Sequence, residues 1–147
     1  MSSCVGIVYS DAYRKISSIS PKFEDRFSLV MDLLNAYGLV DHLLRIPPVE
    51  CFSEPQEMEL LTPFHSSEYI AAVERLSRLY SDDDEPILTK ENEDFFDEYN
   101  LFYDCPGFTS LYEYSLASVR GSIAAADSLI NNHCKVILVY QSFVLLF

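Results

Sequence analysis

The chain has 147 residues, which is enough to bury the core of one ordinary domain. Nearly half of the residues are apolar, including ten Phe and ten Tyr, and this composition excludes a disordered tail. The formal net charge of −13 argues against a nucleic-acid surface, which would be basic, and favours basic partners such as Lys-rich peptides.

The first half of the chain alternates one apolar run with helical patterns. Residues 5–9 (VGIVY) predict a buried strand, and residues 10–20 are expected to form a loop. Ser20 and Pro21 predict the start of a helix over about 21–37, which Gly38 ends. Two prolines in residues 45–49 predict an extended connector.

Two more helices are expected before the middle of the chain, one over about 54–61 and one from Ser66 to about residue 80. His65 lies between them, with no second histidine or carboxylate at ligand spacing. We therefore expect a packed structural histidine there, not a metal ligand.

Residues 81–98 hold nine acidic residues and one lysine, which predicts a solvated surface insertion that is partly helical near Phe95 and Phe96. The loop Tyr103-Asp104-Cys105-Pro106-Gly107 follows it. Asp104 could hold the backbone of a substrate, or it could only shape the turn, and its spacing alone favours the turn.

The last part of the chain predicts a helix and a strand. A helix starts at Thr109 or Ser110 and runs to about Ile130, and residues 135–140 form a buried strand. The helix carries small residues at three- and four-residue intervals, which permit close packing: Ala117, Gly121, Ala124, Ala125 and Ser128. The order of elements predicts one α/β layered domain with a parallel sheet and no internal repeat.

Several features bear on location and chemistry. The four cysteines show no C-x-x-C pairing, which predicts reduced thiols in an intracellular protein. No secretion signal is visible, and the apolar run 136–147 is too short to span a bilayer. Phosphate-loop, Rossmann, nucleophile-elbow and H-E-x-x-H motifs are all missing from the sequence, so these residues form no convincing catalytic centre.

Several stretches read together resemble successive landmarks of the class I histone deacetylases. The resemblance runs from about Val5 to Val136, and Tyr103 before Asp-Cys-Pro with Cys134-Lys135-Val136 is most like the histone deacetylase 8 type. The landmarks are Pro21-Lys22, Arg26-x-Ser28, Leu34-Asn35-Ala36-Tyr37, Phe64-His65-Ser66-Ser67-Glu68-Tyr69-Ile70 and Tyr103-Asp104-Cys105-Pro106. They cover about the first third of such a catalytic domain.

The resemblance implies an incomplete arginase/deacetylase-like three-layer α/β fold with a parallel sheet, helix-rich in this portion. The family hydrolyses acetyl-lysine amides of histones and other proteins with an active-site zinc, in the nucleus and cytoplasm. Residues implied to bind substrate at the pocket rim are Asp104, Tyr103, Lys22 and Phe23. Residues implied to line an inner channel are Arg26, Tyr9 and Tyr114. A fixed positive charge in such a channel requires that Arg26 be buried and paired.

The chain departs from the family at its end. Residues 5–136 would form the N-terminal part of the domain, and residues 137–147 a divergent apolar tail in place of a Gly-Gly-Trp-His-His segment. The family's zinc ligands and catalytic Tyr have no counterparts, so we expect no zinc to bind this chain and no activity from it alone. The ending resembles that of a truncated or mis-spliced product.

The sequence also bears on two other functions. A non-catalytic module could bind a deacetylase partner or an acetylated peptide, and the apolar last strand predicts self-association. A nucleotide-binding domain is disfavoured, because no Gly-rich loop follows the first strand.

Overall fold

The computed structural model describes residues 4–21, 25–50, 53–80, 88–101 and 107–139. The chain divides into two compact units. The sheet unit combines Met1–Glu50 with Tyr114–Phe147, and the helical unit consists of Cys51–Glu113. Nothing in the sequence pattern indicated this division, and each unit is described by itself.

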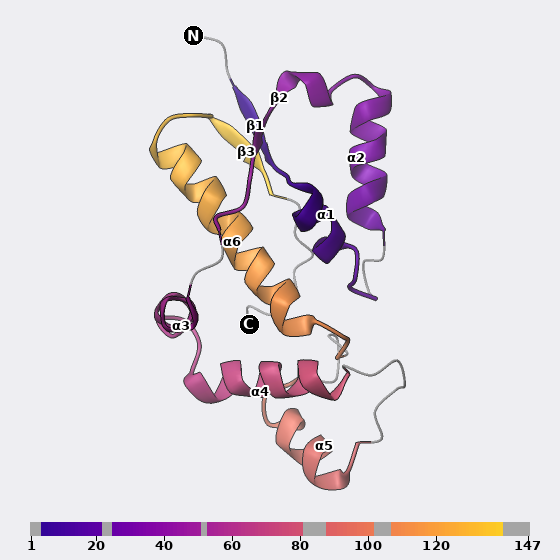
Figure 1. The fold of residues 1–147 in the computed structure, drawn as a ribbon, viewed down its shortest axis with the longest axis vertical. Coiled ribbons are helices and arrows are strands. Elements are labelled where there is room, and N and C mark those ends of the chain that lie inside the picture. The colour runs from indigo at the N-terminus through magenta and orange to yellow at the C-terminus, as the bar shows by residue number, and fades with distance from the viewer. Residues whose placement is uncertain (1–3, 22–24, 51–52, 81–87, 102–106, 140–147) are drawn as a thin grey trace. The chain divides into compact units, whose positions relative to one another are not determined.

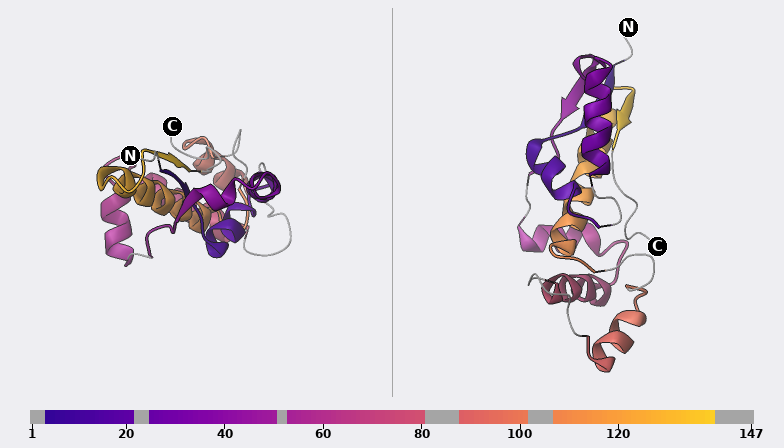
Figure 2. Two further views of the ribbon diagram at one scale, coloured as in Figure 1. Left: turned by 90° about the horizontal axis from the view of Figure 1, so that it is seen from above. Right: turned by 90° about the vertical axis from the view of Figure 1, so that its right-hand side faces the viewer.

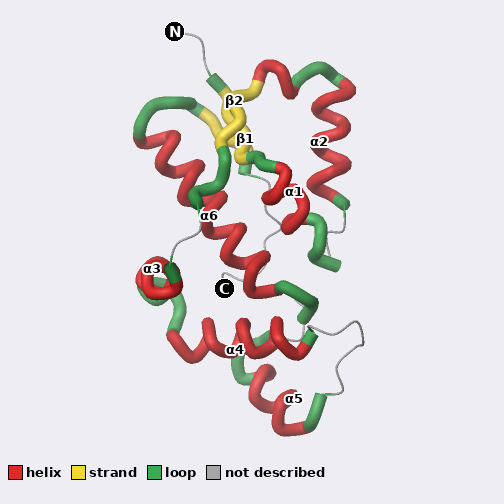
Figure 3. The backbone as a smooth tube through the Cα atoms, viewed as in Figure 1, coloured by secondary structure: helices red, strands yellow, loops and turns green. Residues whose placement is uncertain are grey.

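A three-stranded parallel sheet organises the sheet unit (Figure 1). Its strands are β1 (Val5–Val8), β2 (Leu43–Ile46) and β3 (Val136–Leu138), and their order is β2-β1-β3. Val5 pairs with Leu43 on one side and with Val136 on the other. The prediction of an α/β fold with a parallel sheet in a mostly helical chain is therefore confirmed. The colouring of Figure 3 shows how much of the described chain is helical.

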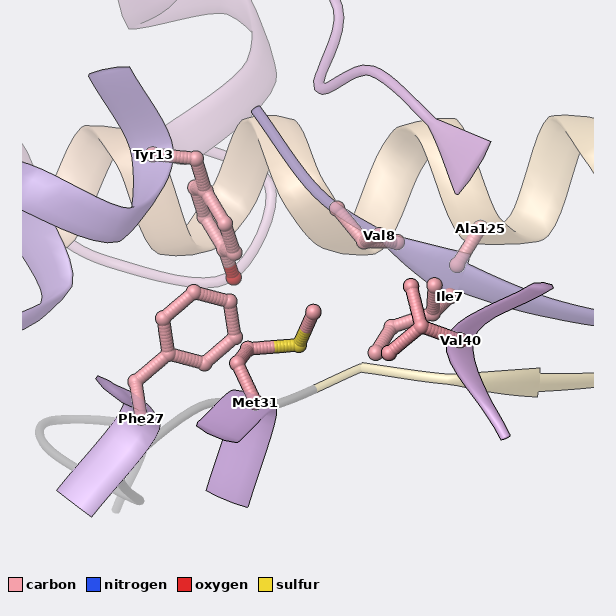
Figure 4. Close-up of a cluster of buried hydrophobic side chains, with 7 residues drawn as sticks. All are labelled: Ile7, Val8, Tyr13, Phe27, Met31, Val40 and Ala125. Atoms are coloured by element: carbon pink, nitrogen blue, oxygen red, sulfur yellow. The ribbon is translucent and has the colours of Figure 1, made fainter. Parts of the chain in front are cut away.

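The central strand β1 is covered on both of its faces. Gly6, Ile7 and Val8 are consecutive and all buried, although successive residues of a strand point to opposite faces. Helices α2 (Arg26–Ala36) and α6 (Leu111–Ile130) lie on opposite sides of the sheet in Figure 1, and Figure 2 gives two further views of this arrangement. Figure 4 shows the main cluster of buried side chains around β1, which is made by Ile7, Val8, Tyr13, Phe27, Met31, Val40 and Ala125.

The small residues of α6 are what lets this helix approach the sheet closely. Ala124 and Ala125 are buried in two neighbouring clusters, and Gly121 lies against the ring of Tyr13. A Cβ atom at Gly121 would lie 2.9 Å from Tyr13 Oη, which is closer than real contacts of this kind. The predicted role of the small-residue face is confirmed.

Residues 10–20 do not form the loop that was expected. They contain α1 (Asp11–Ser17), whose N-cap is Ser10, because the Ser10 hydroxyl accepts a hydrogen bond of 3.0 Å from the Tyr13 N–H. Tyr13 is then buried against the sheet unit's core. The signal was present in Ser10-Asp11, an N-cap followed by an acidic first turn.

Three further expectations need correction. Helix α2 begins at Arg26, after a left-handed Asp25, and not near Pro21. Residues 43–46 form β2 where only an extended connector was expected from Arg45 onward. Strand β3 is not buried, since the side chains of Val136 and Leu138 are exposed.

The helical unit contains α3 (Glu54–Leu61), α4 (Ser67–Leu79) and α5 (Lys90–Asp97). All three helices follow the sequence expectations, including the helix near Phe95 and Phe96 within the acidic stretch. A short 3-10 helix, η1 (Val40–His42), belongs to the sheet unit. Within the described parts of the chain, no helix combines the length and apolar character that a membrane span requires.

Arg75 of α4 connects α4 to α5 in two ways. Its guanidinium donates a hydrogen bond to the Asn92 side chain and lies over the ring of Phe95, 4.7 Å from the ring centroid. Phe96, the next residue, is fully buried. These contacts hold the helix of the acidic stretch against α4, because a cation over an aromatic ring is attracted by the ring's electrons.

The exposed outer side of β3 predicts association between chains. Among the described residues, β3 pairs only with β1. We predict that the other edge of β3 accepts a strand from a second chain. We expect concentration-dependent association in sedimentation velocity, and Val136→Lys should reduce it, because a lysine on an edge strand opposes strand addition. Leu129→Lys, which changes an exposed leucine near the end of α6 in the same unit, is the matched control and should leave association unchanged. A monodisperse monomer with a sharp cooperative melt would contradict the prediction.

Candidate functional site

The candidate inner-channel residue Tyr9 lies directly after the last residue of β1. Its N–H donates a hydrogen bond of 2.9 Å to the carbonyl of Ile46, the last residue of β2. In open parallel sheets, ligands bind beyond the carboxyl ends of the strands. The parallel pairing of β1 and β2 therefore places Tyr9 at the edge of the sheet where a site is expected.

The Tyr9 side chain is held by three neighbours. Its ring stacks on Phe27 of α2, with the centroids 6.1 Å apart, and the Arg45 guanidinium lies 5.3 Å from its centroid. Its hydroxyl donates a hydrogen bond of 3.0 Å to the Asp11 carboxylate. Tyr13 approaches the edge of Phe27, as Figure 4 also shows, at a centroid distance of 5.8 Å. The ring of Tyr9 is thus oriented by aromatic, cationic and anionic contacts together.

Arg26 is exposed, so the expectation that it is buried is wrong. The reason is its position on α2. Residues three and seven places apart lie on one helix face, and Leu29 and Leu33, at these spacings from Arg26, are exposed as well. The opposite face of α2 carries Phe27 and Met31 into the core.

Tyr114 occupies a different environment from Arg26. It lies on α6 within the sheet unit and is buried, and its backbone carbonyl accepts a hydrogen bond of 3.1 Å from the Ser118 hydroxyl. Burial agrees with a wall of a channel and equally with an ordinary core tyrosine, so its inner-channel role stays a prediction.

The four residues expected at the rim lie outside the described residues. Lys22 and Phe23 fall in the segment 22–24, and Tyr103 and Asp104 fall in the segment 102–106. Their roles stay predictions. The structure does show what holds the ends of each segment, because Ser20 and Phe27 are buried around the first, and Leu101 and Phe108 around the second.

Helix α4 fixes the chain just after the second segment. A Cβ atom at Gly107 would lie 2.9 Å from Tyr80 Cδ2 and 3.0 Å from Leu76 Cγ, so only glycine fits this close approach. The Thr109 hydroxyl donates a hydrogen bond to the Tyr80 carbonyl. The Tyr112 N–H donates another, of 3.2 Å, to the Ser77 hydroxyl. The residues that follow the candidate substrate loop, from Gly107 to Tyr112, are therefore held by packing and hydrogen bonds against the C-terminal part of α4.

The helical unit is electrostatically negative around Tyr112. Partial burial raises the pKa of the Tyr112 phenol above its ordinary value, and the nearby carboxylates of Glu57 and Glu74 raise this pKa further. At the start of α4, hydrogen bonds from backbone and serine groups, Ser66 among them, lower the pKa of the Glu68 carboxyl. A cationic ligand is favoured near such a surface.

The described residues do not fit a zinc ion. They contain no group of three or more His, Cys, Asp and Glu side chains placed to hold a metal. His65 is partly buried and stacks on Tyr69, with the ring centroids 5.3 Å apart, which agrees with the structural role expected for it. His42 and His133 are exposed and are far apart in the sequence.

Sequence reasoning missed the residues that position Tyr9. Arg45 belongs to β2, and the short apolar run LLRI before the two prolines was the available signal for that strand. Phe27 was expected on a helix, and Tyr13 in a loop, but neither was connected to Tyr9. Aromatic contacts between elements leave no local spacing pattern in the sequence, so they become visible only in the folded chain.

Comparison with known proteins gives consistent matches. Residues 20–142 match the family model described as the histone deacetylase domain. The chain is 28% identical over 129 residues to histone deacetylase 8 of Danio rerio, covering 88% of this chain and 30% of that protein. It is 26% identical over 130 residues to histone deacetylase 8 of Xenopus tropicalis, covering 88% and 31%. It is 29% identical over 120 residues to histone deacetylase 9 of Arabidopsis thaliana, covering 79% and 24%.

The chain thus spans less than a third of the length of each of these relatives. Both candidate rim segments lie inside the matched range, and so do Arg26 and Tyr114. Tyr9 precedes it.

The close packing at Gly107 predicts that a larger residue at this position destabilises the chain. Gly107→Ala should lower the free energy of unfolding by about 1–3 kcal/mol, because the new methyl group forces Tyr80 and Leu76 apart. Urea denaturation followed by circular dichroism measures the change. Phe64→Ala is the control, since Phe64 is exposed in the same unit and its loss should change stability by less than about 0.5 kcal/mol. Equal stability of wild type and Gly107→Ala would show that the loop exit is not tightly packed.

Proposed function

The chain belongs to the histone deacetylase family, and on that premise we propose that it forms the N-terminal portion of a zinc-dependent deacetylase acting on acetyl-lysine amides of histones and other proteins. The observation that carries the proposal is the family match over residues 20–142, which covers most of the chain. Residues 5–136 would be this portion, with 81–98 as a surface insertion and 137–147 as a divergent tail. Its location would be the nucleus and cytoplasm.

The role of this portion is to bind and orient the substrate. The Asp104 carboxylate would accept hydrogen bonds from backbone N–H groups of the substrate, which are stronger than bonds between neutral groups. Tyr103 would lie beside Asp104, and Lys22 and Phe23 would complete the rim. The close packing of Gly107 against α4 supports this role, because a fixed residue at the end of the loop limits the conformations that the loop can adopt.

The inner channel would be lined by Tyr9, Tyr114 and Arg26. Tyr9 is well suited to this role, because its ring is fixed at the carboxyl end of β1 between Phe27 and Arg45. Arg26, being exposed in these residues, would need other parts of a complete domain to cover its charge.

We further propose that these 147 residues alone do not catalyse deacetylation. Zinc in this family activates water for attack on the amide, and such a site needs three protein ligands and a base. The described residues contain no such ligand group. The sequence also lacks counterparts of the family's zinc ligands, so the proposal is that residues outside this stretch of chain would hold the zinc ion. No catalytic step is assigned to the residues present.

A second function, a non-catalytic interaction module, is favoured by one observation. Leu29 and Leu33 on α2 are exposed, as is Tyr37, the C-cap residue of this helix, and the three residues follow one another at four-residue intervals. Exposed apolar stripes of this kind occur at protein–protein contacts. The partner would be a deacetylase, and the module could also bind an acetylated peptide.

The inactivity proposal has a direct test. Purified chain with added zinc should release no acetate above background from an acetyl-lysine peptide. Histone deacetylase 8 of Danio rerio, assayed in the same buffer, is the positive control. Turnover by the purified chain that disappears on removal of zinc would contradict the proposal.

The substrate-binding proposal has its own test. Titration with an acetyl-lysine peptide, followed by amide NMR shifts, should show binding that Asp104→Asn weakens by about tenfold or more, because hydrogen bonds to a charged acceptor are worth about 1.5–3 kcal/mol. Asp94→Asn is the matched control, since Asp94 is an exposed aspartate of α5. Equal weakening by both substitutions, or no shifts at high peptide concentration, would contradict the role of Asp104.

A further inference from the structure

Two cysteines from opposite ends of the sequence lie side by side in the sheet unit. Cys4 immediately precedes β1 and Cys134 lies two residues before β3, and their Sγ atoms are 3.7 Å apart. The sheet itself brings them together. Val5 pairs with Val136, and the Lys135 N–H donates a hydrogen bond of 3.0 Å to the Cys4 carbonyl.

The two thiols differ in their access to solvent. Cys134 is buried and packs in a cluster with Ile46 and Ala124, whereas Cys4 is only partly buried. Burial raises the pKa of the Cys134 thiol above its ordinary value, and the hydrogen bond with Cys4 adds to this rise. Cys4 is therefore the thiol that a dissolved reagent meets first.

Gly6 leaves the space that the Cys134 thiol occupies. A Cβ atom at Gly6 would lie 2.9 Å from Cys134 Sγ. A disulfide needs its sulfurs about 2.05 Å apart, so these thiols must approach further, and rotation about their side-chain bonds is the movement that would bring them together.

We propose that Cys4 and Cys134 form a modification site, a dithiol that closes to an intramolecular disulfide when the chain meets a small-molecule disulfide such as oxidised glutathione. The Cys4 thiol loses its proton, and its thiolate attacks one glutathione sulfur, breaking the glutathione disulfide and releasing one glutathione thiol. The Cys134 thiolate then attacks the Cys4 sulfur of the mixed disulfide and releases the second. The two protein thiols lose two electrons and two protons, and one oxidised glutathione becomes two reduced molecules.

The disulfide would join β1 to β3 across 130 residues of sequence. A cross-link that closes a long loop restricts the unfolded chain, so the oxidised protein should resist unfolding more than the reduced protein does. The inference is independent of the proposed deacetylase role. Cys4 and Cys134 precede β1 and β3, whereas Tyr9 follows β1 at the other edge of the sheet, and disulfide formation needs no substrate.

The test uses the full chain incubated with oxidised glutathione, blocked with iodoacetamide and digested with trypsin without reductant. Cleavage after Lys and Arg places the four cysteines in four different peptides, which are 1–14, 46–75, 91–120 and 121–135. We expect peptides 1–14 and 121–135 to be linked, with a mass about 2 Da below their sum. The urea midpoint of the oxidised chain should also exceed that of the same sample after dithiothreitol.

Three comparisons decide the outcome. The double variant Cys51→Ser/Cys105→Ser keeps the proposed pair and should give the same link, whereas Cys4→Ser should abolish it. The link should form at least about tenfold faster in folded chain than in urea, because folding holds the thiols together. The proposal is overturned if, in folded wild-type chain incubated with oxidised glutathione, the cysteines of peptides 1–14 and 121–135 carry only iodoacetamide or glutathione groups. It is also overturned if the link forms as fast in urea as in the folded chain.

Discussion

The burial of β1 on both faces is the constraint on which the sheet unit depends. A central parallel strand needs a neighbour on each side and a helix on each face, and β2, β3, α2 and α6 supply these. Gly6 is the tightest point, because a Cβ atom there would lie 2.7 Å from Ile46 Cδ1 on one neighbouring strand and 3.3 Å from Ile137 Cγ1 on the other. The inner-channel role proposed for Tyr9 depends on this arrangement, because Tyr9 directly follows Val8, the last residue of β1.

Much of this architecture is readable from the sequence because it is encoded locally. Three patterns are of this kind: the apolar run of β1, the small-residue face of α6 and the glycine that follows α2. Each pattern lies within a single element or directly beside it. Helix α1 and strand β2 were missed for different reasons. Helix α1 has only seven residues, and its main signal in the sequence is the N-cap at Ser10. Strand β2 has only four residues, and the two prolines that follow it favour an extended connector over a strand.

The candidate site was less predictable, because its contacts join distant segments. The stacking of Tyr9 on Phe27 and the position of Arg45 above Tyr9 depend on how β1, β2 and α2 pack. The exposure of Arg26 has the same origin, since a helix face is buried or exposed according to what lies against it, and this is not a property of its own sequence. Asp104 was a candidate from its loop alone, but the loop favoured a turn, and only the family resemblance favoured a substrate role for it and added Lys22 and Phe23. These roles remain predictions.

The division of the chain also bears on its biosynthesis. The helical unit is one continuous stretch, Cys51–Glu113, whereas the sheet unit is assembled from both ends of the chain. During translation, β1 leaves the ribosome early but cannot pair with β3 until more than a hundred further residues have been made. Because chain segments fold as they emerge, the helical unit is free to form first, and the nascent β1 must wait with an unpaired edge. Strand β1 thus belongs to a unit that is completed only after the helical unit has been synthesised, and a chaperone that shields β1 during this interval would protect the chain from premature aggregation.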